Sequence, residues 1–379
     1  MRYKIAFSFP VLDQKHLQLA HSNFAFSAWI SLLLMVLMIQ TIAKYLPERV
    51  AGQFNALLIL SLALMYGMLI AFTLQGYGAF SIFFASATLL VSMAFCTLFY
   101  KSSRKLKDLA GKPWFNVALI FVAISTLGSF YLSYMMATGT TNQHAYLGAV
   151  YWFLHFQYNG WFFFASMGLL INLLHAKNIT IASEKKAFLA LAITCIPTYG
   201  LSILWAQLPF WVYLIIVVAS MIQLYGWSIL LIDLVKQRVL KKLNLGFIGK
   251  LLIIIPGLAY SVKILLQTAS VIPSMSDMAF GFRPIVIAYL HLVLLASFSI
   301  FLFGYLYIKQ ENRFGNFAKN GLLLFIIGVI LNEAILGTQG IASVFYINFP
   351  YVNEILFGIA LLIFAGVSLI QIPQKDVEA

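Results

Sequence analysis

Eleven long apolar stretches follow one another along nearly the whole chain, and they limit its possible folds more than any other feature. Each has about 17 to 25 residues, enough for a helix rising about 1.5 Å per residue to cross a hydrocarbon core of roughly 30 Å. The runs lack the alternating pattern of barrel strands, and backbone groups facing lipid must be hydrogen-bonded within their own segment, so helices are predicted. The stretches cover approximately residues 20–43, 54–74, 79–100, 115–137, 147–173, 187–206, 209–233, 247–271, 284–307, 321–341 and 354–372.

The composition places the chain in the same class. Hydrophobic residues make up 62% of it and charged residues only 9%, against about 45–50% and about 25% in soluble domains. The connections between the apolar stretches are short. We therefore predict an all-α, polytopic integral membrane bundle of about eleven transmembrane helices, in which residues 1–379 form a single transmembrane domain.

The basic residues indicate how the helices are oriented. Lys and Arg are crowded in alternate loops, with five each in residues 101–113 and 236–250 and three each in 174–186 and 308–320, while the connections near residues 76, 140, 207 and 348 hold none. If the crowded loops are cytoplasmic, the inner side carries 19 basic residues and the outer side 4. This asymmetry predicts an outer N-terminus and an inner C-terminus. The net charge of +13 then indicates topology and contact with anionic lipid, not a nucleic-acid surface.

Other common signals are missing from the sequence. Residues 1–20 carry scattered charges and lack the apolar run of a cleavable signal peptide. Cys96 and Cys195 lie in separate apolar stretches without CxxC spacing, so we interpret them as small buried hydrophobic residues. The chain contains no Walker-type or GxGxxG motif and no convincing internal repeat.

Four histidines lie at or within apolar stretches, and the predicted topology places all four in the outer half of the membrane. His21 lies at the outer boundary, His144 and His155 lie on one face of the fifth stretch about 16 Å apart, and His291 lies about 10 Å below the boundary. A single intramembrane histidine is commonly a neutral packing residue that bonds to a neighbouring helix. Several on separate helices at similar depth favour a shared site.

The stretch around His155 adds further polar groups. Tyr151, His155, Tyr158, Asn159 and Phe162 follow a helical spacing that places them on one face. A hydrogen-bonding face in the middle of the membrane predicts a site or a cavity, not a surface in contact with lipid.

The order of the histidine-bearing stretches resembles that of the catalytic subunit of haem-copper oxidases and nitric oxide reductases, a twelve-helix fold whose second, sixth, seventh and tenth helices carry the ligand histidines. If the present chain lacks the first helix of that family, its helices 1, 5, 6 and 9 correspond to these four. The loss of one helix would also invert the N-terminus, in agreement with the charge count.

Three short motifs carry this resemblance. His21-Ser22-Asn23 is similar to the His-x-Asn of the reductases, whose histidine ligates the low-spin haem. The segment His155 to Gly160 resembles their His-x-x-x-Glu-Gly, with Asn159 in place of the glutamate. Tyr289-Leu290-His291 stands where that family has His-x-His, and the retained second histidine corresponds to a low-spin haem ligand.

The departures from the family pattern are equally specific. Helix 6 has no His-His pair, so two of three ligands for a second metal are missing, and Tyr289 replaces the histidine that would hold the high-spin haem. Tyrosinate can ligate haem iron, but we interpret Tyr289 as a packing hydroxyl. The resemblance thus implies one b-type haem with bis-histidine ligation by His21 and His291, and no second metal. His155 and Asn23 are expected to accompany this cofactor site.

Two other polar residues within the apolar stretches indicate a path for protons or a substrate instead of a haem site. Glu333 in the tenth stretch and Lys263 in the eighth both fall in the outer half, where either group could serve proton or substrate movement. Lys263 could instead extend to the outer interface or pair with Glu333. Together with Tyr158 and Asn159, they are our candidates for a polar path.

Three classes of function remain open on the sequence. The first is a haem protein acting in electron transfer, haem sensing or nitric-oxide-related redox chemistry without a complete binuclear centre. The second is a proton-coupled or small-solute transporter or channel, and the third is a cofactor-free scaffold subunit. Expected partners are the lipid bilayer, haem and possible further membrane subunits or an electron donor, with no nucleic acid. The expected location is the bacterial inner membrane.

Overall fold

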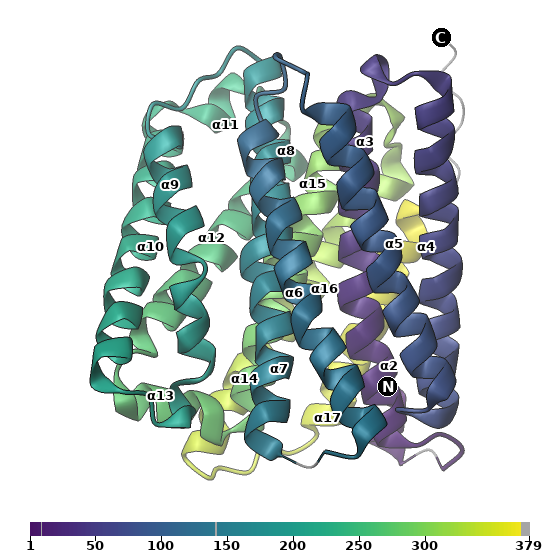
Figure 1. The fold of residues 1–379 in the computed structure, drawn as a ribbon, viewed down its shortest axis with the longest axis vertical. Helices are drawn as coiled ribbons and strands as arrows, with labels where there is room; N and C mark the ends of the chain where they lie inside the picture. The colour runs from purple at the N-terminus through teal and green to yellow at the C-terminus, as the bar shows by residue number, and fades with distance from the viewer. Residues whose placement is uncertain (9, 141, 373–379) are drawn as a thin grey trace. The chain divides into compact units, whose positions relative to one another are not determined.

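The computed structural model describes residues 1–8, 10–140 and 142–372, and every regular element within them is a helix (Figure 1). Nine of the described helices are long and apolar enough to cross a membrane, judged by length and composition. This agrees with the predicted class of all-helical membrane proteins. The nine are Gln14–Tyr45, Glu48–Gln75, Ala79–Ser103, Lys112–Thr138, Phe210–Lys236, Phe247–Ala269, Arg283–Lys309, Asn316–Val344 and Val352–Ile370.

The span predicted at 147–173 is helical but is not one of these nine. It lies in an unbroken helical run made of α7 (Gln143–His155), the π-helical segment η3 (Phe156–Phe162) and α8 (Phe163–Ala176). The run is long enough to cross a membrane, but its first half is rich in polar and aromatic residues.

The span predicted at 187–206 differs more strongly from the expectation. Only α9 (Glu184–Thr194) is α-helical, and the chain continues through the short 3₁₀ helices η4 (Pro197–Ser202) and η5 (Leu204–Ala206). Pro197 has no N–H to donate and disfavours α conformation in the residue before it. The continuous helix predicted over 187–206 is therefore wrong beyond Thr194.

The chain divides into two compact units. The first consists of Met1, Phe9–Thr180 and Thr198–Ala206, and the second of Arg2–Ser8, Ile181–Pro197 and Gln207–Ala379. The prediction of a single transmembrane domain stays a prediction.

In the first unit, α4 packs against α2 and α5, while α6 packs against α7, η3 and α8. The interior is largely aromatic, with edge or stacked contacts that join Phe54, Phe95, Phe99 and Phe115 across three helices. The elements of this unit, besides those named above, are α2 (Gln14–Phe24), η1 (Ala25–Ile30), α3 (Ser31–Ile42), η2 (Ala43–Tyr45), α4 (Glu48–Gln75), α5 (Ala79–Ser103) and α6 (Lys112–Thr138).

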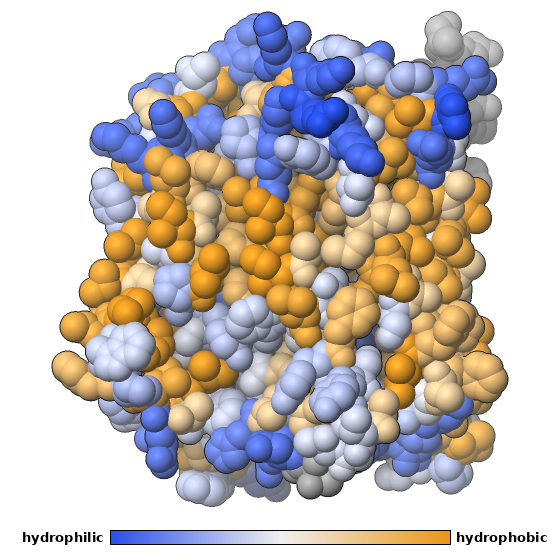
Figure 2. Space-filling view, viewed as in Figure 1, coloured by the Kyte–Doolittle hydropathy of each residue, from blue (hydrophilic) through white to orange (hydrophobic). Residues whose placement is uncertain are grey.

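The outward side of this unit is apolar. Ile59, Leu74, Phe80 and Phe83 are each more than 60% exposed, which marks a surface in contact with lipid. Over α5 and α6 the visible surface is hydrophobic along the middle of the helices and hydrophilic at the end with the 101–113 loop (Figure 2).

In the second unit, α16 packs against α17 and α14, while α12 packs against α10, η6 and α15. The α16–α17 contact is close because Gly321 and Gly366 each face the backbone of the other helix. Besides α9, the elements of this unit are α1 (Arg2–Phe7), α10 (Phe210–Lys236), α11 (Val239–Lys242), α12 (Phe247–Ala269), α13 (Pro273–Gly281), α14 (Arg283–His291), η6 (Leu292–Ser299), α15 (Ile300–Lys309), η7 (Glu311–Arg313), α16 (Asn316–Val344) and α17 (Val352–Ile370).

Candidate functional site

Within the described residues, each of the three π-helical segments begins close to a histidine of the predicted apolar stretches. The segment η1 begins four residues after His21, η3 begins directly after His155, and η6 begins directly after His291. A π-turn bonds each N–H to the carbonyl five residues back, is uncommon, and occurs frequently at functional sites. The three π-helical segments thus lie on the same helices as His21, His155 and His291.

The wider turns need additional hydrogen-bond donors, and serines supply two of them. Ser31 Oγ donates to the Phe26 carbonyl at 2.8 Å, and Ser299 Oγ donates to the Leu294 carbonyl at 2.8 Å, each reaching five residues back. Trp161 Nε1 in η3 donates to Ser31 Oγ at 3.1 Å. This bond joins the two π-helical parts of the first unit, so their conformations support one another.

His155 is fully buried in the first unit and contacts two of the residues predicted to share its face, Tyr158 and Asn159. Its Nδ1 lies 3.0 Å from Asn159 Nδ2, and its ring centroid is 6.4 Å from that of Tyr158. An amide nitrogen only donates, so Nδ1 of His155 accepts this bond and the ring proton is on Nε2. In this arrangement Nδ1 is engaged with Asn159 and Nε2 carries the proton, so neither ring nitrogen has a free lone pair to offer a metal.

Two further polar residues beside His155 were not predicted from the sequence. The Tyr199 hydroxyl donates to the Gly148 carbonyl at 2.9 Å, and its ring centroid lies 5.9 Å from that of His155. Gln157 Nε2 donates to Ser125 Oγ at 2.9 Å, while Gln157 Oε1 is buried without a partner among the described residues. Gln157 lies between His155 and Asn159, and only its position inside an apolar stretch could have indicated it.

His291 lies in the second unit at the end of α14 and is half-buried. Its Nδ1 is 2.8 Å from the Ile287 carbonyl oxygen. A carbonyl only accepts, so Nδ1 carries the proton and Nε2 has the lone pair. This is the tautomer that a histidine ligand of a metal adopts, with its second nitrogen bonded to a backbone carbonyl. Tyr289, two residues earlier, is also half-buried.

The other predicted cofactor residues lie in the first unit. His21 is exposed near the end of α2. Asn23 is half-buried and donates from Nδ2 to the Leu19 carbonyl at 2.9 Å. His21 and His291 thus belong to different units, and their pairing stays a prediction. His144 is exposed at the start of α7, with its ring 5.3 Å from that of Trp205.

The predicted polar path in the second unit consists of two residues on different helices. Glu333 on α16 is half-buried and accepts from Asn332 Nδ2 at 3.1 Å. Lys263 on α12 is fully buried, with Nζ 4.8 Å from the centroid of the Tyr260 ring. The expectation that Lys263 extends to the outer interface is wrong, because its side chain has no exposed surface and its ammonium lies over an aromatic ring.

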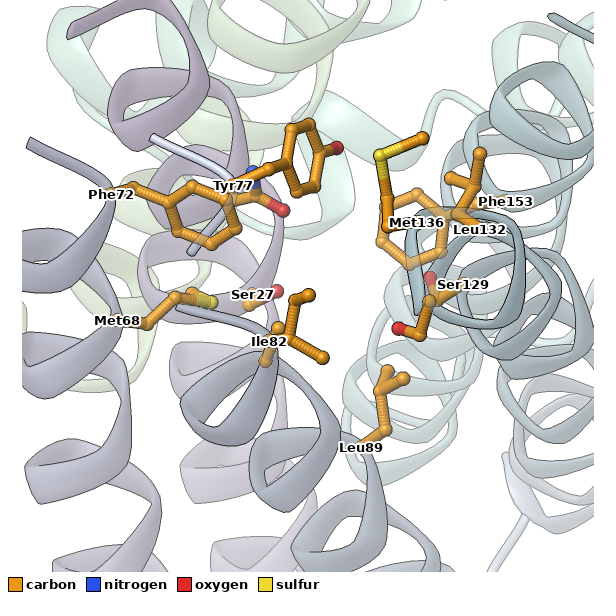
Figure 3. A pocket seen from close by; sticks show the side chains of 13 residues that line it. Ser27, Met68, Phe72, Tyr77, Ile82, Leu89, Ser129, Leu132, Met136 and Phe153 are labelled. Carbon is orange, nitrogen blue, oxygen red and sulfur yellow. The ribbon is translucent and has the colours of Figure 1, made fainter. Parts of the chain in front are cut away.

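A pocket opens within the first unit, between η1, α4, α5, α6 and α7 (Figure 3). It holds about 540 Å³ of empty space, including the part that opens to the outside. Among the predicted site residues only Asn23 lines it. Ser129 and Ser133, which follow Ser125 at four-residue intervals on α6, also line it, and this periodic serine pattern is the sequence signal that could have revealed the pocket.

The described residues contain no group of three or more His, Cys, Asp or Glu side chains arranged to hold a metal ion. A comparison with known protein families finds no match, and none of the curated proteins is significantly similar to the chain.

Proposed function

We propose that this protein is a membrane haem protein of the haem-copper oxidase-like group, in which His21 and His291 ligate one b-type haem. The observation that carries the proposal is the hydrogen bond between His291 Nδ1 and the Ile287 carbonyl. It fixes the ring in the tautomer whose Nε2 can bind iron, and carbonyl-oriented histidines are common among metal ligands. The π-helical segments beside His21 and His291 support the same assignment.

The residues fit a haem at His291 and do not fit one at His155. The fully buried imidazole of His155 accepts a hydrogen bond from Asn159 at Nδ1 and therefore holds its proton on Nε2. Neither nitrogen then has a free lone pair for iron. In our proposal His155 therefore orders the interior of the first unit together with Tyr158 and Asn159. Tyr289 and Asn23 lie two residues from the proposed ligands and position their helices.

A haem held by His21 and His291 would supply one-electron transfer and leave no ligand position for a substrate. The protein's own contribution is to hold His291 in one tautomer and to surround the cofactor with apolar helices, which sets the polarity around it. The proposed role is therefore to pass or sense electrons, not to reduce a substrate. The proposal includes eleven membrane crossings, an outer N-terminus and a bacterial inner-membrane location, with an electron donor or further subunits as partners.

The test is the visible spectrum of protein purified in detergent after expression with added haem precursor. The proposal predicts a Soret band and a six-coordinate low-spin spectrum. His291→Ala and His21→Ala should each remove the low-spin features, whereas His144→Ala, the matched control at an exposed position, should leave them unchanged. Size-exclusion profiles of all variants show whether they remain folded.

Three results would overturn the assignment. Wild-type protein without any Soret band would exclude haem binding under these conditions. Retention of the full low-spin spectrum in the His21→Ala, His291→Ala double variant would show that the ligands are elsewhere, and loss of haem in His155→Ala alone would identify His155 as the ligand.

A second candidate function is proton-coupled or small-solute transport. It is favoured by the presence of Glu333 and the fully buried Lys263 in membrane-spanning helices of the same unit. Ionisable groups at such depth are costly and commonly mark an ion or proton path. Reconstituted, haem-free protein would then carry a proton-coupled flux that Glu333→Gln abolishes, and an equal flux in that variant would reject this function.

A further inference from the structure

The pocket of the first unit combines hydroxyl groups with apolar and aromatic walls. Ser27 comes from the π-helical segment η1, and Ser129 and Ser133 come from successive turns of α6. Figure 3 shows Ser27 and Ser129 on opposite sides of the pocket, with Phe72 on the side of Ser27 and Phe153 on the side of Ser129. A molecule in this space would meet hydroxyls and phenyl rings from two directions.

The three serine hydroxyls differ from most others in the helices of this chain. Many of the other helical serines and threonines donate to a carbonyl three or four residues back, as Ser92 does to Thr88 at 2.9 Å and Thr126 does to Ala123 at 2.7 Å, although the buried hydroxyls of Ser166 and Ser297 have no partner among the described residues. Among the described residues, Ser27, Ser129 and Ser133 make no such bond. A helix serine normally satisfies its hydroxyl in this way or with solvent, so three unbonded hydroxyls at one pocket are donors and acceptors available to a ligand.

The other lining residues determine the charge of that ligand. None of the 13 residues that line the pocket is Asp, Glu, Lys, Arg or His. Burying a carboxylate or an ammonium here without a partner would be strongly unfavourable. The ligand is therefore neutral. The pocket is also unsuited to the haem of the proposed function, since haem carries two propionate carboxylates and no basic side chain lines this space.

The apolar residues that line the pocket favour a ligand with an aromatic ring. Phe72 and Phe153 present phenyl groups, and Met68 and Met136 present thioethers, which make favourable contacts with aromatic rings. Serine hydroxyls both donate and accept, so they match a hydroxyl group, which also does both. We propose that this pocket binds a neutral aromatic alcohol of the phenol class, with its hydroxyl on the serines and its ring against the phenylalanines. This site is independent of haem binding.

The experiment uses the full chain in detergent and a photoreactive alkylphenol that carries a diazirine, with crosslinks mapped by mass spectrometry. The proposal predicts saturable labelling on α6 or α4 at the pocket, displaced by the unlabelled alkylphenol. The methyl ether of the same probe cannot donate a hydrogen bond and should label more weakly by about threefold to tenfold, the factor for about one lost hydrogen bond.

Variants of the serines separate binding from folding. Ser129→Ala with Ser133→Ala should weaken phenol labelling by about threefold to a hundredfold, for the loss of one or two hydrogen bonds, and should remove the advantage of the phenol over its methyl ether. These substitutions remove no hydrogen bond within the described protein, so the variant should fold. Ser92→Ala on α5, which does not line the pocket, is the control and should label like the wild type.

Three results would overturn the proposal. They are labelling that does not saturate, labelling that maps outside the pocket, and equal labelling of the wild type and the double serine variant by the phenol.

Discussion

The close approach of α16 and α17 leads to a prediction that can be worked out from the structure. A Cβ added at Gly321 would lie 2.7 Å from the Gly366 carbonyl oxygen and 2.9 Å from Ile370 N, while ordinary contacts begin at 3.4 Å. The two helices would have to separate by about 0.7 Å at this point. Forcing extra atoms into a packed contact costs about 1–3 kcal/mol, so Gly321→Ala should lower the free energy of unfolding by that amount.

The same two helices supply the controls. Gly337 on α16 and Gly358 on α17 have no atom within 4 Å of an added Cβ, so alanine at either position gains helix propensity, worth about 0.5–1 kcal/mol, without a clash. Thermal unfolding in detergent, followed by tryptophan fluorescence, should show a Tm lower by roughly 2–10 °C for Gly321→Ala. The two control variants should have an unchanged or higher Tm.

A double variant with alanine at both Gly321 and Gly366 tests whether the single contact between α16 and α17 is responsible for the loss of stability. A Cβ at Gly366 would lie 2.7 Å from Phe325 N and 2.9 Å from the Gly321 carbonyl oxygen, so both substitutions push the same pair of helices apart. Once the helices have separated to make room for one methyl group, the second methyl group costs less. The loss of unfolding free energy in the double variant should therefore be smaller than the sum of the losses in the two single variants. Equal Tm values for Gly321→Ala and Gly337→Ala would refute the close packing.

Three further predictions concern the first unit and the topology. Trp161→Phe should lower the free energy of unfolding by about 0.5–1.5 kcal/mol through loss of the bond to Ser31 Oγ, measured by thermal unfolding, and no change would show that the bond does not couple the π-helical segments. Burial, together with the charge and hydrogen bond of Tyr146, raises the pKa of the Tyr77 phenol at the pocket. Because a raised pKa keeps the Tyr77 side chain neutral up to and above its ordinary range, labelling by the alkylphenol probe should be equal at pH 6 and pH 9, and a fall between these pH values would contradict this. In a background without the native cysteines, Asn142→Cys should react with a membrane-impermeant maleimide added to intact cells and Asp108→Cys should not; the reverse pattern would invert the proposed topology.

The sequence predicted the features that depend on local composition and spacing. The apolar stretches predicted where the long helices lie, and the four-residue spacing of His155 and Asn159 predicted that these side chains meet, as their 3.0 Å contact shows. The helix predicted over 187–206 is wrong beyond Thr194, because Pro197 interrupts the α-helix even though the composition around it is apolar.

The remaining features depend on contacts between distant parts of the chain. The π-turns in η1 and η3 are stabilised by a bond between Trp161 and Ser31, which are 130 residues apart. The pocket requires Ser27 on one element to face Ser129 on another, which no single-helix pattern contains. The periodicity of one helix shows which residues share its face but not which neighbour that face meets, and this limits prediction of such sites.

The most direct test of the central claim is haem content in the purified wild-type protein, measured by the reduced-minus-oxidised spectrum and confirmed by pyridine haemochrome analysis. The account predicts b-type haem in stoichiometric amount, low-spin in both oxidation states, and lost on replacement of His291. Protein that is folded and monodisperse after expression with ample haem precursor, yet contains no haem, would contradict the account.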